Sequence, residues 1–170
     1  MSPRARLRPI APLPEEPPAT VERLRRGLDH KRIGLAYVWV ALVSLLFGGL
    51  MAMAIRWQWT WPGSAVPLLG PLTPNAYGSL FTLHGLVMIF FAVGPLLMGG
   101  MATLVLPLLV GARNLAFPRL SRLGLWFYVA SCLALVAGLF APLGPASTGW
   151  TLFPPLSSWV GSPGSGVTWA

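Results

Sequence analysis

Three long uncharged stretches divide the chain. Residues 33–55 form the first and residues 123–143 form the third, and the second lies between Trp57 and Ala112, where no Asp, Glu, Lys or Arg occurs. A helix needs about 20 apolar residues to cross a hydrocarbon core of about 30 Å. The pattern therefore predicts an all-α protein with three membrane-spanning helices.

The second stretch is longer than one crossing requires. Its helix is expected to start near residues 75–79 and to end near Leu106, so it must tilt, kink or overhang the hydrocarbon core. Pro95 predicts a kink inside this helix, and Pro107 predicts its end. The glycines that would allow close contact between helices are Gly48, Gly49, Gly94, Gly99 and Gly100.

Basic residues are distributed unevenly between the two ends of these helices. Several precede the first helix and three lie within residues 111–122, whereas Arg56 is the only one between the first and second helices and none follows the third. By the positive-inside rule, the N-terminus and loop 111–122 are cytoplasmic. The loop 56–78 and the tail 144–170 are then outside.

The N-terminal residues form a separate segment. Residues 1–28 are rich in Pro and Arg and are expected to be disordered. Residues 20–30 could form a short polar helix, and His30 is expected to be a solvated surface residue. The predicted organisation is a cytoplasmic segment 1–28, a helical membrane unit 29–143, and an external segment 144–170 that is either an ordered loop over a larger body or a frayed end.

Composition supports the membrane assignment. The chain is 55% hydrophobic and 9% charged, whereas a soluble domain carries about 25% charged residues. The net charge of +8 is explained by topology, so we expect lipid rather than nucleic acid around the protein. Cys132 is the only cysteine, which excludes a disulfide framework within the chain and is typical of a small packing residue.

His84 is the candidate for chemistry within the second stretch. An imidazole in hydrocarbon is costly, so it normally faces a partner inside the protein. Gly85 follows it and would let another helix or a flat ligand approach closely. Three interpretations stay open: an axial ligand of a haem iron, a hydrogen bond to a neighbouring helix, and a proton relay. Arg56 is explained by a side chain that reaches the membrane interface beside Trp57.

Several blocks of residues resemble the N-terminal part of subunit I of the haem–copper terminal oxidases, the cytochrome c oxidase group. The blocks are DHKRIG at 29–34, Gly48-Gly49 through Arg56, Gln58 and Pro62-Gly63, the LFTLHG and MIFF elements within 77–91 with Pro95 and Gly99-Gly100, VLPLLVGARNLAFPRL from Val105 followed by Trp126, and GWTLFPPLS at 149–157. They cover most of residues 29–157 in the family's order.

The resemblance implies roles for three residues. His84 matches the axial ligand of the low-spin haem, which is expected to be of type A. Arg56 matches an arginine that hydrogen-bonds a peripheral haem group, where a cation would also raise the reduction potential of the haem. Trp150 matches a loop tryptophan over the haem region, although it is equally typical of an anchor at the membrane interface.

The resemblance also implies what this chain does not carry. A subunit I of this family is a twelve-helix-type bundle. The second ligand of the low-spin haem and the ligands of the high-spin haem and of copper lie in its remainder, so residues 1–170 alone are expected to be inactive. We expect a truncated or split subunit. Its implied partners are the rest of subunit I, subunits II and III, and cytochrome c or quinol as electron donor, in a bacterial-type plasma membrane.

One block departs from the family at the proton-uptake route called the D pathway. Asn114 replaces the aspartate of that route, Arg113 replaces a proline, and Thr103 and Ser121 replace two asparagines. Because an amide cannot titrate, we expect this route to be non-functional here. The alternatives to a cytochrome c oxidase are a quinol oxidase or nitric oxide reductase relative and a non-catalytic haem-binding or assembly protein.

Overall fold

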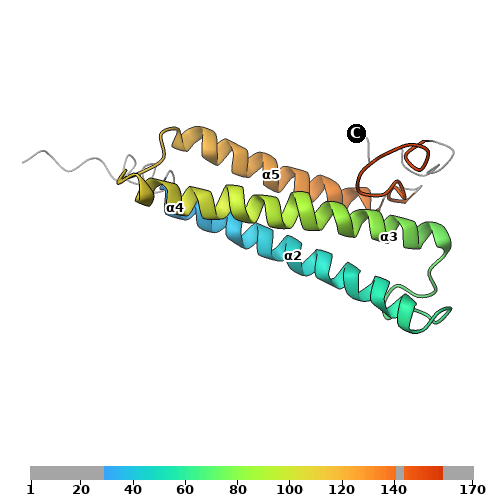
Figure 1. The fold of residues 1–170 in the computed structure, drawn as a ribbon. Coiled ribbons are helices and arrows are strands. Elements are labelled where there is room, and N and C mark those ends of the chain that lie inside the picture. Colours follow the sequence, from blue (N-terminus) through green and yellow to red (C-terminus); the bar gives the residue numbers. More distant parts are fainter. Residues whose placement is uncertain (1–28, 141–143, 159–170) are drawn as a thin grey trace, which may run out of the picture.

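The computed structural model describes residues 29–140 and 144–158, and in these residues it consists of three long helices joined by loops (Figure 1). The first is α2 (His30–Thr60), and the third is α5 (Pro118–Gly138). The second runs over Pro74–Leu109 and is built from α3 (Pro74–Leu86), two π-helical segments η1 (Val87–Val93) and η2 (Pro95–Met101), and α4 (Ala102–Leu109). Each of the three is long and apolar enough to cross a membrane, which confirms the predicted fold class.

The first helix begins earlier than the apolar run that predicts it. Asp29 caps α2, because its side chain accepts a hydrogen bond from the Lys31 amide at 3.3 Å. His30 is the first helical residue and is only 3% exposed, so the prediction of a solvated histidine is wrong. The reason is tertiary, since the loop between α4 and α5 packs onto this helix end through Asn114. Residues 1–28, which include most of the predicted helix 20–30, lie outside the described residues.

The second helix continues through both of its interior prolines, Pro95 and Pro107. Pro95 has no N–H to donate, so the Phe91 carbonyl loses the partner it would have in a regular α-helix. The Tyr128 hydroxyl of α5 donates to that carbonyl at 2.5 Å. Around Pro95 the backbone widens into π-helix, as the bond from the Gly94 N–H to the Ile89 carbonyl shows. Pro107 lies inside α4, so the prediction that it ends the helix is wrong by two residues.

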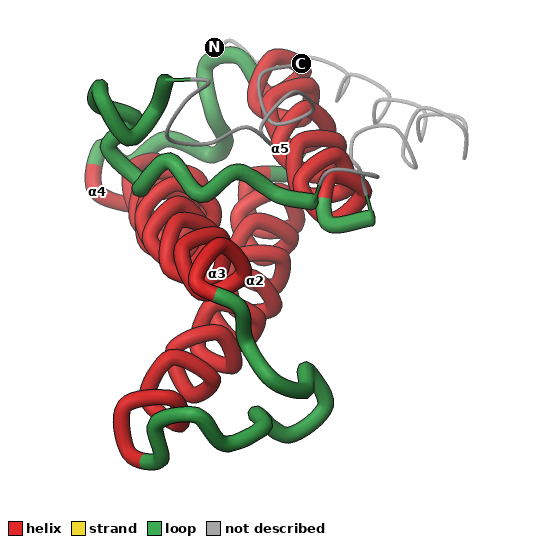
Figure 2. Tube along the Cα trace, turned by 90° about the vertical axis from the view of Figure 1, so that its right-hand side faces the viewer, coloured by secondary structure: helices red, strands yellow, loops and turns green. Residues whose placement is uncertain are grey.

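Small residues let α2 approach the second helix closely. Gly34, Ala41 and Gly48 recur every seven residues along α2, which contacts α3, η1, η2 and α4. A methyl group at Gly34 would lie 2.6 Å from Leu104 Cγ, and one at Gly48 would lie 2.7 Å from Met88 Sδ. Both distances are too short for real contacts, so the packing depends on the missing side chains. Figures 1 and 2 both show α2 and α3 diverging toward the loop that joins them.

Gly48→Ala should destabilise the helix pair, whereas Gly49→Ala should not. The added methyl at position 48 would also lie 3.2 Å from Val87 Cγ1, and a branched side chain in a helix has no other rotamer to adopt readily. Overpacking of this kind costs about 1–3 kcal/mol. A methyl at Gly49 meets nothing within 4 Å, and there Ala gains up to about 1 kcal/mol in helix propensity. Thermal unfolding of the two variants tests this difference, and equal melting temperatures would contradict it.

The third helix begins at Pro118, five residues before the predicted start at Leu123. Proline suits the first turn of a helix, where its missing N–H has no partner to lose. The aromatic ring of Tyr128 stacks on Tyr37 of α2 with 5.5 Å between centroids. Within the described residues no side chain of α5 is buried, so most of its apolar surface faces outward.

Candidate functional site

His84 of α3 faces α2. Its Nδ1 lies 2.9 Å from the Gly48 carbonyl oxygen. A carbonyl can only accept, so this hydrogen bond requires the proton on Nδ1. Nε2 then carries the lone pair of the ring. The contact depends on Gly48, whose missing side chain lets the helices come close enough.

The other neighbour of His84 is a loop tryptophan. Trp150 packs on Gly85, where a methyl group would lie 2.7 Å from Trp150 Cβ and 2.9 Å from its Cγ. The sequence suggests that Gly85 admits a helix or a flat ligand, and the structure shows Trp150 in contact with it. Trp150 itself is 40% exposed. Residues 148–150 and the turn of α3 around His84 therefore lie together, as Figure 1 shows for the loop over α3.

Arg56 lies further along α2. It is eight residues beyond Gly48, which is about 12 Å along a helix axis. Its side chain is exposed, and within the described residues no ion pair or hydrogen bond engages its guanidinium. The adjacent Trp57 Nε1 and Gln58 Oε1 are buried and also lack a hydrogen-bond partner there. Buried polar atoms without partners are costly, so this end of α2 has polar groups that a further component could satisfy.

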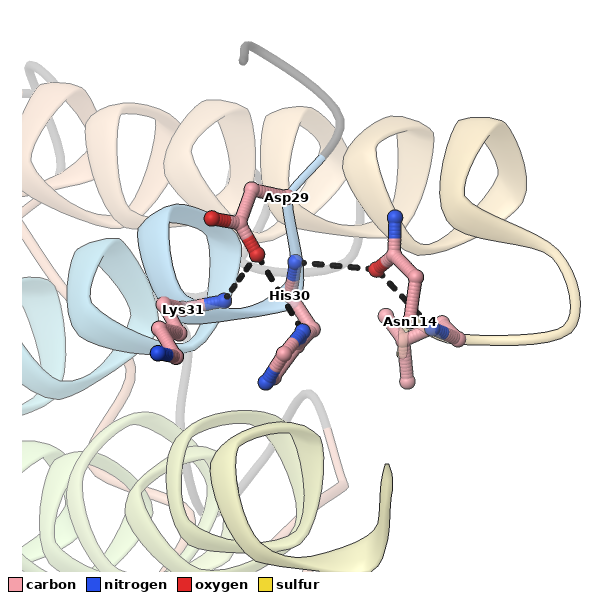
Figure 3. Close-up of polar contacts among 5 residues, drawn as sticks. Asp29, His30, Lys31 and Asn114 are labelled. Atoms are coloured by element: carbon pink, nitrogen blue, oxygen red, sulfur yellow. Dashed lines mark hydrogen bonds and ion pairs between the residues drawn. The ribbon is translucent and has the colours of Figure 1, made fainter. Parts of the chain in front are cut away.

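Asn114 holds the other end of α2 (Figure 3). Its Oδ1 accepts hydrogen bonds from the His30 amide at 3.0 Å and the Leu115 amide at 2.9 Å. The Asp29 carboxylate lies 3.1 Å from His30 Nδ1, although the two are not aligned as a hydrogen bond. Asn114 thus satisfies one of the amides that a helix leaves free at its N-terminus. The sequence gives no sign of this contact, which spans 84 positions of the chain.

The two other residues at altered proton-path positions lie on different helices. Thr103 is in α4 and is half-buried. Ser121 is in the first turn of α5, where its hydroxyl donates to the Phe117 carbonyl at 3.3 Å. This bond ties Ser121 to its own helix. Residues 30–170 contain no Asp or Glu, so no carboxylate of that part of the chain can act beside them.

The residues around His84 fit a haem. An imidazole whose Nδ1–H bonds a backbone carbonyl presents Nε2 to a metal, which is the usual arrangement of a metal-binding histidine. Within the part of the chain that the structure describes, no three His, Cys, Asp or Glu side chains gather as a metal site. A haem iron takes a single imidazole from one helix, so the arrangement of His84 is compatible with this group.

Sequence reasoning missed two residues near His84. Ser79 donates to the Pro145 carbonyl at 2.8 Å, and Thr82 accepts from the Gly149 amide at 2.9 Å. Both are buried on α3. Ser79, Thr82 and Gly85 follow one another at intervals of three residues, which places all three on one helix face. This spacing was the signal available in the sequence.

Known proteins match most of the chain. Residues 32–170 match the family described as Cytochrome C and Quinol oxidase polypeptide I. A heme-copper oxidase subunit I+III from Aeropyrum pernix is 40% identical over 88% of this chain and 18% of its own length. Cytochrome c oxidase subunit 1 proteins from Corynebacterium efficiens and Thermostichus vulcanus are 40% and 41% identical, over 81% and 86% of this chain and 23% and 26% of their own lengths. The chain therefore spans about a quarter or less of these relatives. The resemblance to subunit I is confirmed, and the chain belongs to the cytochrome c and quinol oxidase polypeptide I family.

Proposed function

We propose that this chain is the N-terminal part of the catalytic subunit of a respiratory terminal oxidase and that it supplies one axial ligand of the low-spin haem. The complete subunit transfers electrons to oxygen and couples this to proton translocation. The observation that carries the proposal is the hydrogen bond from His84 Nδ1 to the Gly48 carbonyl. It fixes the tautomer that leaves Nε2 available to iron. A histidine that only joined two helices would make the same hydrogen bond with the same tautomer, so the haem spectrum of His84→Ala separates the two roles.

Three residues would hold the haem. His84 would ligate the iron, Arg56 would hydrogen-bond a peripheral group of a type A haem, and Trp150 would cover the side of α3 next to the ligand. The haem, when bound, supplies a centre that takes up and passes on one electron at a time. The chain's own residues orient it and set its surroundings: the Gly48 carbonyl holds the imidazole ring, and the free guanidinium of Arg56 would favour the reduced iron.

The remaining parts of the enzyme would come from outside this chain. The high-spin haem and copper would be bound by the rest of subunit I, and subunits II and III would complete the complex. The family description covers both cytochrome c and quinol oxidases, so both donors are candidates for this protein.

The complete enzyme tests this proposal. Haem extracted from it should have the pyridine haemochrome spectrum of haem A, and oxygen uptake should follow the addition of reduced cytochrome c or of a quinol. Uptake with only one of the two donors identifies that donor. A purified complex that contains this chain but neither haem nor oxygen uptake would favour a non-catalytic assembly role instead.

The orientation of the helices in the membrane is part of the proposal. The distribution of basic residues supports a topology with loop 111–122 in the cytoplasm and segment 144–170 outside, and we propose a bacterial-type plasma membrane. In intact cells, a cysteine introduced by Ser121→Cys should resist a membrane-impermeant maleimide until the cells are opened, whereas one introduced by Ser157→Cys should react at once. The Cys132→Ala background removes the native thiol. The reverse pattern of labelling would invert the topology.

A further inference from the structure

Segment 144–150 rests on one face of α3. Ser79, Thr82 and Gly85 form this face, which we call the docking face. The Ser79 hydroxyl donates to the Pro145 carbonyl at 2.8 Å, and the Thr82 hydroxyl accepts from the Gly149 amide at 2.9 Å. Gly85 is covered by Trp150. The segment is thus fixed at three successive positions along the helix.

Thr82 is the central contact of the docking face. Its hydroxyl donates to the Gly78 carbonyl at 2.8 Å while it accepts from Gly149, so both of its hydrogen-bonding directions are used. The side chain is 1% exposed, and water therefore cannot replace either bond easily. Gly149 has a φ of +76°, a conformation that turns the chain and suits glycine. Because Trp150 comes next, the bond to the Gly149 amide fixes the point from which the indole extends.

The docking face and the histidine share one turn of helix. His84 lies between Thr82 and Gly85 in sequence, and its ring points to α2 while the docking face points to the segment after α5. Any movement of Trp150 away from Gly85 would open the backbone beside His84 to water. A methyl group at Gly85 would force such a movement, since it would lie 2.7 Å from Trp150 Cβ and 3.1 Å from Cδ1.

We propose that Thr82 and Gly85 are positioning residues that hold Trp150 beside His84: the Thr82 hydroxyl fixes the Gly149 amide, and the absence of a side chain at Gly85 gives the indole its place. This inference rests on the proposed role of His84 as a haem ligand. It extends that role by making the loop after α5 part of the surroundings of the ligand. Exclusion of water from the backbone beside the ligand would favour the reduced, less charged iron when a haem is bound.

Thr82→Val and Thr82→Ser in the complete oxidase test the inference. Valine keeps the shape but removes both hydrogen bonds, whereas serine keeps the hydroxyl. We expect the amides of segment 144–150 to exchange about tenfold faster in Thr82→Val, as the loss of one buried hydrogen bond predicts, and to exchange at the native rate in Thr82→Ser. The midpoint potential of the low-spin haem should fall in Thr82→Val and return in Thr82→Ser.

Gly85→Ala provides a second measurement if Thr82→Val does not assemble. It keeps the Thr82 hydroxyl but displaces Trp150, so the potential should again fall. Gly138→Ala is the matched control, because a methyl there meets nothing within 4 Å. Native exchange of the segment in Thr82→Val overturns the inference, and so does a native potential in both Thr82→Val and Gly85→Ala. The haem assignment fails by a different result, namely that His84→Ala retains the low-spin haem. In that case the exchange measurement still reports whether Thr82 holds segment 144–150 on α3.

Discussion

His84→Ala should remove the low-spin haem from the complete oxidase. Alanine supplies no lone pair to iron, and the hydrogen bond to the Gly48 carbonyl at 2.9 Å is lost with the ring. Because a low-spin haem needs strong ligands on both faces, the loss of one imidazole should abolish its absorbance, while haem bound elsewhere in the subunit is retained. Reduced-minus-oxidised spectra of the purified complex measure both components, and oxygen uptake should be abolished together with the low-spin absorbance.

Two further variants separate ligation from packing. His84→Gln can still donate a hydrogen bond to α2 but lacks the imidazole, so it should lose the haem and keep the helices packed. His30→Ala removes the other histidine, which lies at the far end of α2 and is buried at 3% exposure. The His30→Ala variant should therefore show the native spectrum of the low-spin haem. If His84→Ala kept the native spectrum, the hydrogen bond to Gly48 would be a packing contact only.

The hydrophobic pattern predicted the three spanning helices because each apolar run is long and uninterrupted by charge. It could not predict their ends. α2 extends to His30 because Asp29 and Asn114 satisfy its first amides, and the second of these lies far away in sequence. Pro107 was predicted to end a helix, but Leu109 ends it instead. Proline forbids one hydrogen bond, and a helix of this length can lose one and continue.

The site was predicted as far as single residues allow. The pattern of an imidazole in an apolar run followed by glycine identified His84 and Gly85. A polar ring in an apolar run is recognisable from the neighbouring residues alone, because its burial is costly. Its partner was not predictable, since the Gly48 carbonyl is a backbone group on another helix. Thr82 was overlooked for a similar reason. A threonine in a membrane helix usually bonds its own backbone, and only the fold shows that the same oxygen also accepts a hydrogen bond from the Gly149 amide.

Asn114 acquires a structural role that bears on proton entry. Its Oδ1 accepts from the His30 amide at 3.0 Å, at the positive end of the α2 dipole. An aspartate placed there by Asn114→Asp would accept the same bond and be held in its charged form by the amide and the dipole. A carboxylate that stays charged carries no protons. The exposed Arg113 beside it adds positive charge and disfavours proton entry further.

Asn114→Asp should therefore leave turnover and the number of protons pumped per electron unchanged in vesicles that contain the complete enzyme. Asn114→Ala is the structural control, since loss of the cap should cost about 0.5–2 kcal/mol in stability without a specific loss of pumping. Thr103→Val and Ser121→Ala remove hydroxyls that could order water along the altered route, and both should pump normally. A rise in pumping in Asn114→Asp, or its loss in Thr103→Val and Ser121→Ala, would show that protons use this route. Residues 30–170 contain no Asp or Glu. Native pumping in all of these variants would therefore mean that protons enter through carboxylates outside these residues.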